Sequence, residues 1–129
     1  MRAAVILLVF VSSSVLAQFE SVYRIGPECI LEASIENNPI VVPPAKLGFQ
    51  INVQLSKSEG EQFKQFTKGI IGSNLKVTNG FGESLNMPSN RVVTEIGQKF
   101  RLAPYATKEE ANKAMLVLMK KGGRCGKAS

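Results

Sequence analysis

The chain contains no histidine, no tryptophan and no aspartate, and all ten of its acidic residues are glutamate. A Ser-His-Asp triad or a Cys-His pair cannot be built without these side chains. No glycine-rich phosphate-binding loop follows a strand with the required spacing. These absences argue against an enzyme, and we expect a non-catalytic protein without a cofactor.

A hydrolase that works with two carboxylates is the one catalytic alternative that this composition leaves open. The local pairs are Glu59 with Glu61, and Glu109 with Glu110. Both pairs fall in the first turn of an expected helix, where the helix dipole stabilises negative charge. Helix capping therefore explains these glutamates better than catalysis does.

The first 17 residues have the pattern of an export signal. Arg2 precedes an apolar run from Ala3 to Val11, and Val15-Leu16-Ala17 matches a small-residue cleavage site. The run is shorter than the about 20 residues that a transmembrane helix needs, which makes an uncleaved anchor the weaker alternative. We predict cleavage after Ala17, a periplasmic location, and one mature domain over residues 18–129.

Cysteine is scarce, with Cys29 and Cys125 near opposite ends of the expected mature domain. In an exported protein an even cysteine count favours a disulfide over the alternative of two free thiols. An oxidised pair also removes the thiolates that a zinc site would use, so we expect no metal. We predict a Cys29–Cys125 bond that ties the tail to the start of the domain.

Residues 49–72 carry the clearest structural signal. Apolar and polar residues alternate from Phe49 to Leu55, which is typical of a half-buried strand. Ser56 followed by Glu59 is a capping box and predicts a helix start. The expected buried face of this helix comprises Phe63, Phe66 and Ile70, and its expected stop comprises Gly69 and Gly72.

Weaker patterns on either side predict the remaining elements. Thr107 with Glu110 is a second capping box, which opens a helix that buries Ala111, Ala114, Met115 and Leu118 and ends near Lys120. The other expected segments are an irregular lead-in over 18–28, a strand over 29–36, an edge piece or loop over 40–44, strands near 74–78, 81–87, 91–96 and 98–103, and a hairpin turn at Asn79-Gly80.

This order of elements predicts an α+β fold, in which two helices pack on one face of an antiparallel sheet. The sequence also carries a spaced series of short motifs: a strand ending in Leu, a helix with Phe and Thr, Ile-Gly before a strand, a proline turn, Gly before a strand, and a Thr-x-x-Glu-Ala helix. They are found at Leu55, Gly60, Phe63, Phe66-Thr67, Ile71-Gly72, Leu75, Val77, Pro88, Ile96-Gly97, and Thr107 with Glu110-Ala111.

In these motifs, residues 49 to about 119 resemble the periplasmic head subdomain of SecD and SecF, accessory subunits of the Sec protein translocase. The resemblance implies a ferredoxin-like α+β fold and a non-catalytic surface that contacts polypeptide. The sequence departs from that family in having no transmembrane helices and no other part of the SecD periplasmic region. The translocase role is therefore not implied.

Together these features predict a periplasmic protein-binding domain, an immunity or inhibitor protein that neutralises an exported toxin or hydrolase. The alternative is a SecD-like accessory in protein export or envelope assembly that binds unfolded polypeptide. The formal net charge is +6, or +5 without Arg2, which favours a protein partner with an acidic contact surface over nucleic acid. The candidate contacts, on expected turns, are Phe81, Asn86, Met87, Asn90, Arg91 and Tyr105. The alternative is that Phe81 and Met87 belong to the core and that the others are solvated turn residues.

Overall fold

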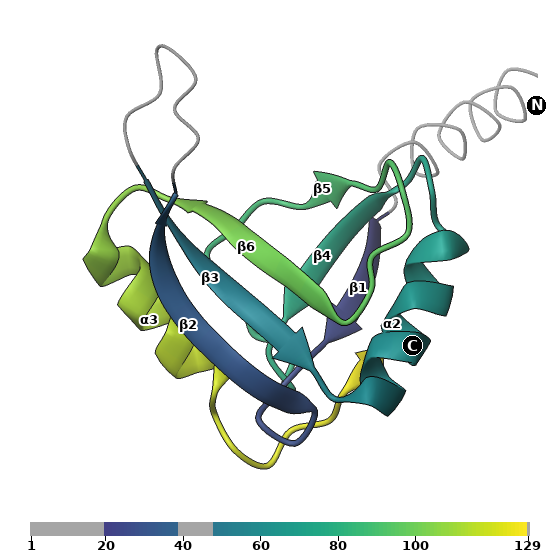
Figure 1. The fold of residues 1–129 in the computed structure, drawn as a ribbon, viewed down its shortest axis with the longest axis horizontal. Helices are drawn as coiled ribbons and strands as arrows, with labels where there is room; N and C mark the ends of the chain where they lie inside the picture. Colours follow the sequence, from purple (N-terminus) through teal and green to yellow (C-terminus); the bar gives the residue numbers. More distant parts are fainter. Residues whose placement is uncertain (1–19, 39–47, 129) are drawn as a thin grey trace, which may run out of the picture.

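A computed structural model describes residues 20–38 and 48–128. The expected leader and the piece expected over 40–44 lie outside the described residues. Within them, the chain forms two helices and seven strands (Figure 1). The elements are β1 (Glu20–Arg24), β2 (Ile30–Asn38), β3 (Gly48–Leu55), α2 (Lys57–Lys68), β4 (Asn74–Thr78), β5 (Asn90–Arg91), β6 (Lys99–Tyr105), α3 (Lys108–Leu118) and β7 (Gly126–Lys127).

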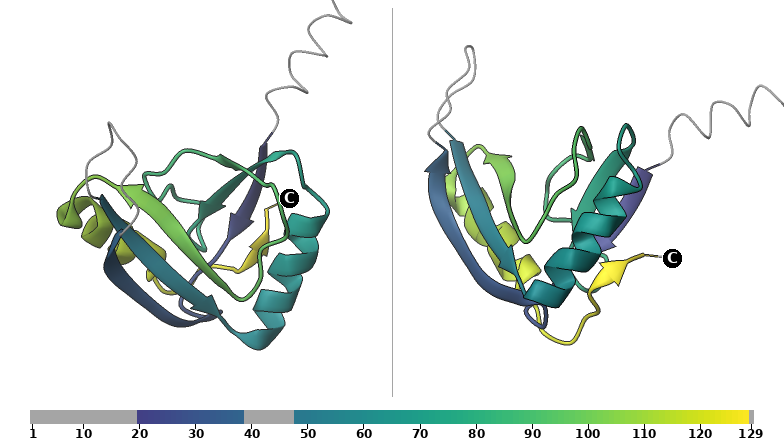
Figure 2. Two further views of the ribbon diagram at one scale, coloured as in Figure 1. Left: turned by 45° about the horizontal axis from the view of Figure 1, so that its top comes forward. Right: turned by 45° about the vertical axis from the view of Figure 1, so that its right-hand side comes forward.

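The described strands form two sheets, so the α+β class is confirmed but the expected single antiparallel sheet is wrong. One sheet has the order β5-β4-β1-β7, and the other has the order β2-β3-β6. The second sheet is antiparallel, whereas β1 and β4 in the first run parallel. The right-hand view of Figure 2 shows the sheets splayed in a V, with β2 and β3 on one side and β1 and β4 on the other.

Strand β1 is the reason for this difference. We expected an irregular lead-in here, but Glu20–Arg24 lies between β4 and β7 and pairs with both. Tyr23 in this strand is only 2% exposed and belongs to the core. Because β1 takes one edge of β4, and β5 the other, β4 cannot join the sheet that contains β6.

The three-stranded sheet has one apolar face, which packs on α3. Ile51, Val53 and Leu55 of the central strand β3 are buried together with Ala111, Ala114 and Leu118 of α3. Figure 1 shows α3 crossing behind β2 and β3. The second capping box is confirmed, because Thr107 Oγ1 accepts a hydrogen bond from Glu110 N at 3.1 Å and Glu110 Oε2 accepts one from Ala106 N at 3.3 Å.

The predicted helix α2 is confirmed, but its capping box forms only in part. Ser56 Oγ accepts a hydrogen bond from Glu59 N at 3.3 Å, as expected. Ser56 N instead donates to Cys29 O at 2.8 Å, which leaves the Glu59 carboxylate free to face inward. Phe63 is fully buried on the expected face. The chain turns after the helix at Gly72, whose φ of +93° favours glycine.

The segment between β4 and β6 has less strand than the sequence predicts. Instead of a two-residue hairpin at Asn79-Gly80, the Asn79 side chain accepts hydrogen bonds from the backbone N–H groups of Phe81 and Glu83. Such side-chain bonds take the place of the backbone hydrogen bonds between paired strands, and they favour a loop. The expected return strand is therefore reduced to one bridge between Thr78 and Ser84, and the expected strand over 91–96 to the short β5.

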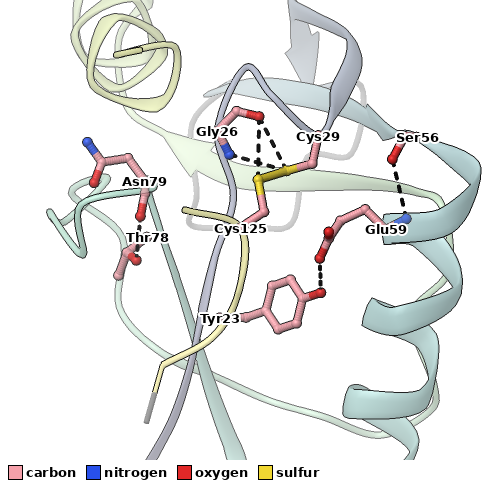
Figure 3. Close-up of a disulfide and its surroundings, with 8 residues drawn as sticks. All are labelled: Tyr23, Gly26, Cys29, Ser56, Glu59, Thr78, Asn79 and Cys125. Carbon is pink, nitrogen blue, oxygen red and sulfur yellow. Dashed lines mark hydrogen bonds between the residues drawn. A yellow bond between two sulfur atoms is a disulfide. The ribbon is translucent and has the colours of Figure 1, made fainter. Parts of the chain in front are cut away.

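The predicted disulfide between Cys29 and Cys125 is confirmed (Figure 3). It joins the residue before β2 to the segment before β7, and the two cysteines are 96 positions apart in the sequence. Closing a loop of this size restricts the unfolded chain strongly. The bond fastens the segment before β7 to the turn between β1 and β2.

Candidate functional site

The face of the three-stranded sheet opposite α3 is polar on all three strands. Cross-strand pairing aligns Glu32 with Gln54, Ser34 with Asn52, and Glu36 with Gln50, and then Asn52 with Arg101 and Gln54 with Lys99. These residues line a hollow of about 450 Å³. We call the surface the polar face, and it comprises Glu32, Ser34, Glu36, Gln50, Asn52, Gln54, Lys99 and Arg101.

Charge is ordered across the polar face. Glutamates stand on β2, side-chain amides on β3, and the basic residues Lys99 and Arg101 on β6. Adjacent strands lie about 4.8 Å apart, so the acidic and basic rows are separated by about 10 Å. No ion pair closes this gap, since Lys120–Glu83 is the one salt bridge that the described residues form. Both rows remain available to a ligand.

Gln50 lies at the floor of this hollow, and its side chain is only partly paired. The residue is 5% exposed, and Nε2 donates a hydrogen bond to Asn52 Oδ1 at 2.7 Å. Its Oε1 is buried and has no hydrogen-bond partner among the described residues. Leaving a buried acceptor unpaired costs about 1–3 kcal/mol.

A second, smaller hollow of about 100 Å³ lies between β6 and the segment that contains β5. Phe63, Leu75 and Phe100 supply apolar lining, while Arg91 and Arg101 carry the positive charge. We call this the apolar hollow. Because Arg101 lines both hollows, the two surfaces adjoin along β6.

The structure brings together three of the six predicted contacts. Met87, Asn90 and Arg91 all line the apolar hollow. Phe81 lies on the 79–83 turn with 45% exposure, and Lys120 Nζ stands 5.1 Å from its ring centroid. Asn86 is exposed with a φ of +57°. Neither of these two residues lines a described hollow.

Tyr105 is a core residue, so we remove it from the set of surface contacts. It is 2% exposed, and its hydroxyl donates a hydrogen bond to Leu85 O at 2.9 Å. Burial raises the pKa of Tyr105 to about 12. The sequence placed it near a turn, but a register irregularity between Phe49 and Ile51 pairs it directly with Phe49 in the sheet.

A buried polar cluster stands beside the disulfide (Figure 3). The Tyr23 hydroxyl donates a hydrogen bond to the carboxylate of Glu59, a residue only 9% exposed. Burial, and then this bond, raise the pKa of Tyr23 well above its ordinary value. A Glu59 oxygen and the sulfurs of Cys29 and Cys125 all lie within 4.8 Å of one another.

The disulfide decides what this cluster can do. Two thiolates and a carboxylate would suit zinc, but sulfurs bonded to each other offer no thiolate ligand. Of the glutamates in the two local pairs, Glu59 accepts a hydrogen bond from Tyr23 and Glu110 caps α3, whereas Glu61 and Glu109 are exposed. The two surface hollows are therefore the candidate functional sites of the described residues.

The polar face was not among the sites predicted from the sequence. Alternation identified the polar sides of the strands at 29–36 and 49–55, yet it gave no strand order. The acidic side of β2 and the basic side of β6 become one surface only because β3 lies between them. Glutamates on one predicted strand and Lys99 with Arg101 on another were the available signal.

No family model matches the chain, and neither a curated protein nor a solved structure shows significant similarity to it. The resemblance to the SecD and SecF head subdomain thus rests on the sequence motifs alone. Among the described residues, no helix is both long and apolar enough to cross a membrane.

Proposed function

We propose that this chain is a non-catalytic periplasmic protein-binding domain, an immunity or inhibitor protein that neutralises an exported toxin or hydrolase by binding it stoichiometrically. The observation that carries the proposal is the apolar hollow, where Met87, Asn90 and Arg91 meet beside Arg101. An apolar floor with arginines at the edge has the composition of a protein-binding anchor site, in which arginine and apolar side chains supply most of the affinity.

The chemistry of the hollow defines the partner's contact surface. Its volume of about 100 Å³ suits one apolar side chain of the partner, seated against residues such as Leu75 and Phe100. Arg91 and Arg101 are both exposed, and guanidinium groups bind carboxylates in a bidentate manner. The partner therefore presents an apolar residue flanked by acidic ones, in keeping with the positive net charge of the chain.

Two features support an exported domain. The disulfide between Cys29 and Cys125 persists in an oxidising compartment, and such bonds are rare in the cytosol. The N-terminal pattern that ends at Ala17 is typical of a signal for export, with cleavage after that residue.

One observation favours the SecD-like accessory as a second candidate. Strand β2 is nine residues long and forms an edge of its sheet, since no described strand pairs with its outer side. An extended polypeptide can add to such an edge through main-chain hydrogen bonds. This candidate would bind many unfolded chains without preference for one partner.

The test uses an exported toxin or hydrolase encoded next to this protein, produced in the periplasm with and without it. We expect survival only with the protein present, and a one-to-one complex in a pull-down. Arg91→Glu should abolish both the survival and the complex. The control Lys68→Glu, a change at an exposed position of α2, should preserve both. Survival that does not depend on the protein, with no complex recovered, would refute this proposal.

The wild-type and Arg91→Glu proteins also distinguish the immunity or inhibitor role from the SecD-like accessory role. A SecD-like accessory should bind several unrelated unfolded polypeptides and ignore the folded effector. Binding of that kind, unaffected by Arg91→Glu, would favour the accessory role.

A further inference from the structure

We propose that the polar face is a second binding site, adjoining the apolar hollow at Arg101, for a free peptide of about three residues. The peptide lies across the strands, with its N-terminal ammonium at the β2 glutamates and its C-terminal carboxylate at Lys99 and Arg101. The site goes beyond the proposed function, because it does not require the protein partner. Its hollow of about 450 Å³ is within the range of small-molecule sites.

The separation of charges sets the length of the ligand. The acidic row on β2 and the basic row on β6 are two strand spacings apart, about 10 Å. An extended chain spans about 3.3–3.6 Å per residue, so a tripeptide places its two terminal charges at this separation. A dipeptide is too short to reach both rows, and a longer peptide must carry one end past the sheet.

The middle of the site fits peptide groups. Gln50, Asn52 and Gln54 point side-chain amides from β3 into the hollow, and an amide both donates and accepts hydrogen bonds. Gln50 Oε1, which is buried and has no partner among the described residues, can accept from a ligand N–H once the side chain turns toward the hollow. Peptide N–H and C=O groups supply the complementary donors and acceptors along an extended ligand.

Other ligand classes fit this arrangement less well. A neutral sugar would leave both charged rows without partners, and a simple anion would be repelled by Glu32 and Glu36. An internal segment of a protein has no terminal charges, so it would need suitably spaced side chains to replace them. The opposed rows with amides between them select a zwitterion that has a peptide backbone.

The experiment titrates the oxidised mature protein with triglycine, using the side-chain amide signals of asparagine and glutamine in nuclear magnetic resonance spectra. We expect the signals of Gln50, Asn52 and Gln54 to shift and saturate at millimolar triglycine. N-acetyl-triglycine lacks the ammonium and triglycine amide lacks the carboxylate, and each should bind about ten-fold more weakly. Diglycine should also bind more weakly than triglycine.

Substitutions at exposed positions test the acidic and the basic row of the site separately, without disturbing the fold. The double variant Glu32→Gln/Glu36→Gln should bind triglycine only as weakly as the wild type binds N-acetyl-triglycine. Its affinity for N-acetyl-triglycine should equal that of the wild type. Lys99→Gln should weaken the binding of triglycine, because only Arg101 then remains for the carboxylate, and should leave the affinity for triglycine amide unchanged. Lys113→Gln, a change at an exposed position of α3, is the matched control and should leave every affinity unchanged.

Three results would overturn the proposal. The first is the absence of any shift at millimolar triglycine. The second is equal affinity for triglycine and a peptide blocked at both ends, which would indicate a protein segment as the ligand. The third is binding that shifts only signals outside the polar face. All three leave the complex with an exported effector intact, so failure here is distinct from failure of the proposed function.

Discussion

The Tyr23 hydroxyl on β1 donates its hydrogen bond to the carboxylate of Glu59 on α2, next to the Cys29–Cys125 disulfide. The two residues are 36 positions apart, and the bond joins the four-stranded sheet to the helix. The ring of Tyr23 also packs against Phe63, with 4.7 Å between ring centroids. One side chain thus connects the sheet, the helix and the core.

The burial of both tyrosines predicts a loss of stability in alkali. The pKa of Tyr23 is raised by burial and by Glu59, and burial raises the pKa of Tyr105 from its ordinary value of 10.0 to about 12. A raised folded-state pKa stabilises the fold below the unfolded pKa, and this contribution is lost as pH rises. The free energy of unfolding should therefore fall as pH rises above about 10.

The measurement is denaturant unfolding across this pH range, with tyrosinate absorbance followed in parallel. We expect the tyrosines to ionise together with unfolding, since they are the two tyrosines of the chain and both are buried. Tyr23→Phe should flatten the alkaline decline relative to wild type. Ionisation near pH 10 in a chain that stays folded would contradict the buried placement.

Removing the disulfide should destabilise the domain markedly. Cys125→Ser is expected to cost about 2–5 kcal/mol, the usual loss for a native disulfide in a small exported domain. Thermal melts of the oxidised wild type and the variant give the comparison. Wild type treated with a thiol reductant should melt like the variant; if reduction leaves the melting temperature unchanged, the bond contributes no stability.

Gly60 in α2 should not tolerate alanine, although alanine favours helices by about 1 kcal/mol. A Cβ at this position would lie 2.9 Å from Gln98 Cα, so the segment before β6 would have to move. Overpacking of this kind costs about 1–3 kcal/mol, more than the gain in propensity. Gly69→Ala is the matched control, because its nearest contact is an ordinary 3.5 Å. A Gly60→Ala protein that melts no lower than Gly69→Ala would disprove the close approach.

The buried face of α2 predicts a large effect at Phe63. This residue is fully buried and stacks near both Tyr23 and Phe100, so Phe63→Ala should cost about 3–5 kcal/mol. Gln65→Ala, on the exposed side of the helix, should change stability by about half a kcal/mol or less. The denaturant midpoints of Phe63→Ala and Gln65→Ala measure this difference. Similar midpoints for the two variants would mean that the helix packs by another face.

Local signals in the sequence were sufficient for the capped helices and for the disulfide. Ser56 and Thr107 act on backbone N–H groups within three residues, and the bond at Cys29 follows from cysteine count and compartment. The two-sheet arrangement was not accessible in this way. The parallel pairing of Tyr23 with Val77 joins distant segments, and no local pattern records it.

The candidate sites show the same division. Met87, Asn90 and Arg91 were identified as turn residues, and they do meet in one hollow. Tyr105 was misplaced because its inward direction depends on the register of β6 against β3. The polar face remained unseen because strand order, rather than any single strand, creates it.

The proposed function requires stoichiometric binding of one exported protein through the apolar hollow. Hydrogen–deuterium exchange of the complex with the neighbouring exported effector tests it most directly. We expect protection on binding in the backbone over 87–92 and 99–102, and loss of that protection in Arg91→Glu. Absence of a complex, or protection confined to α3, would contradict the claim.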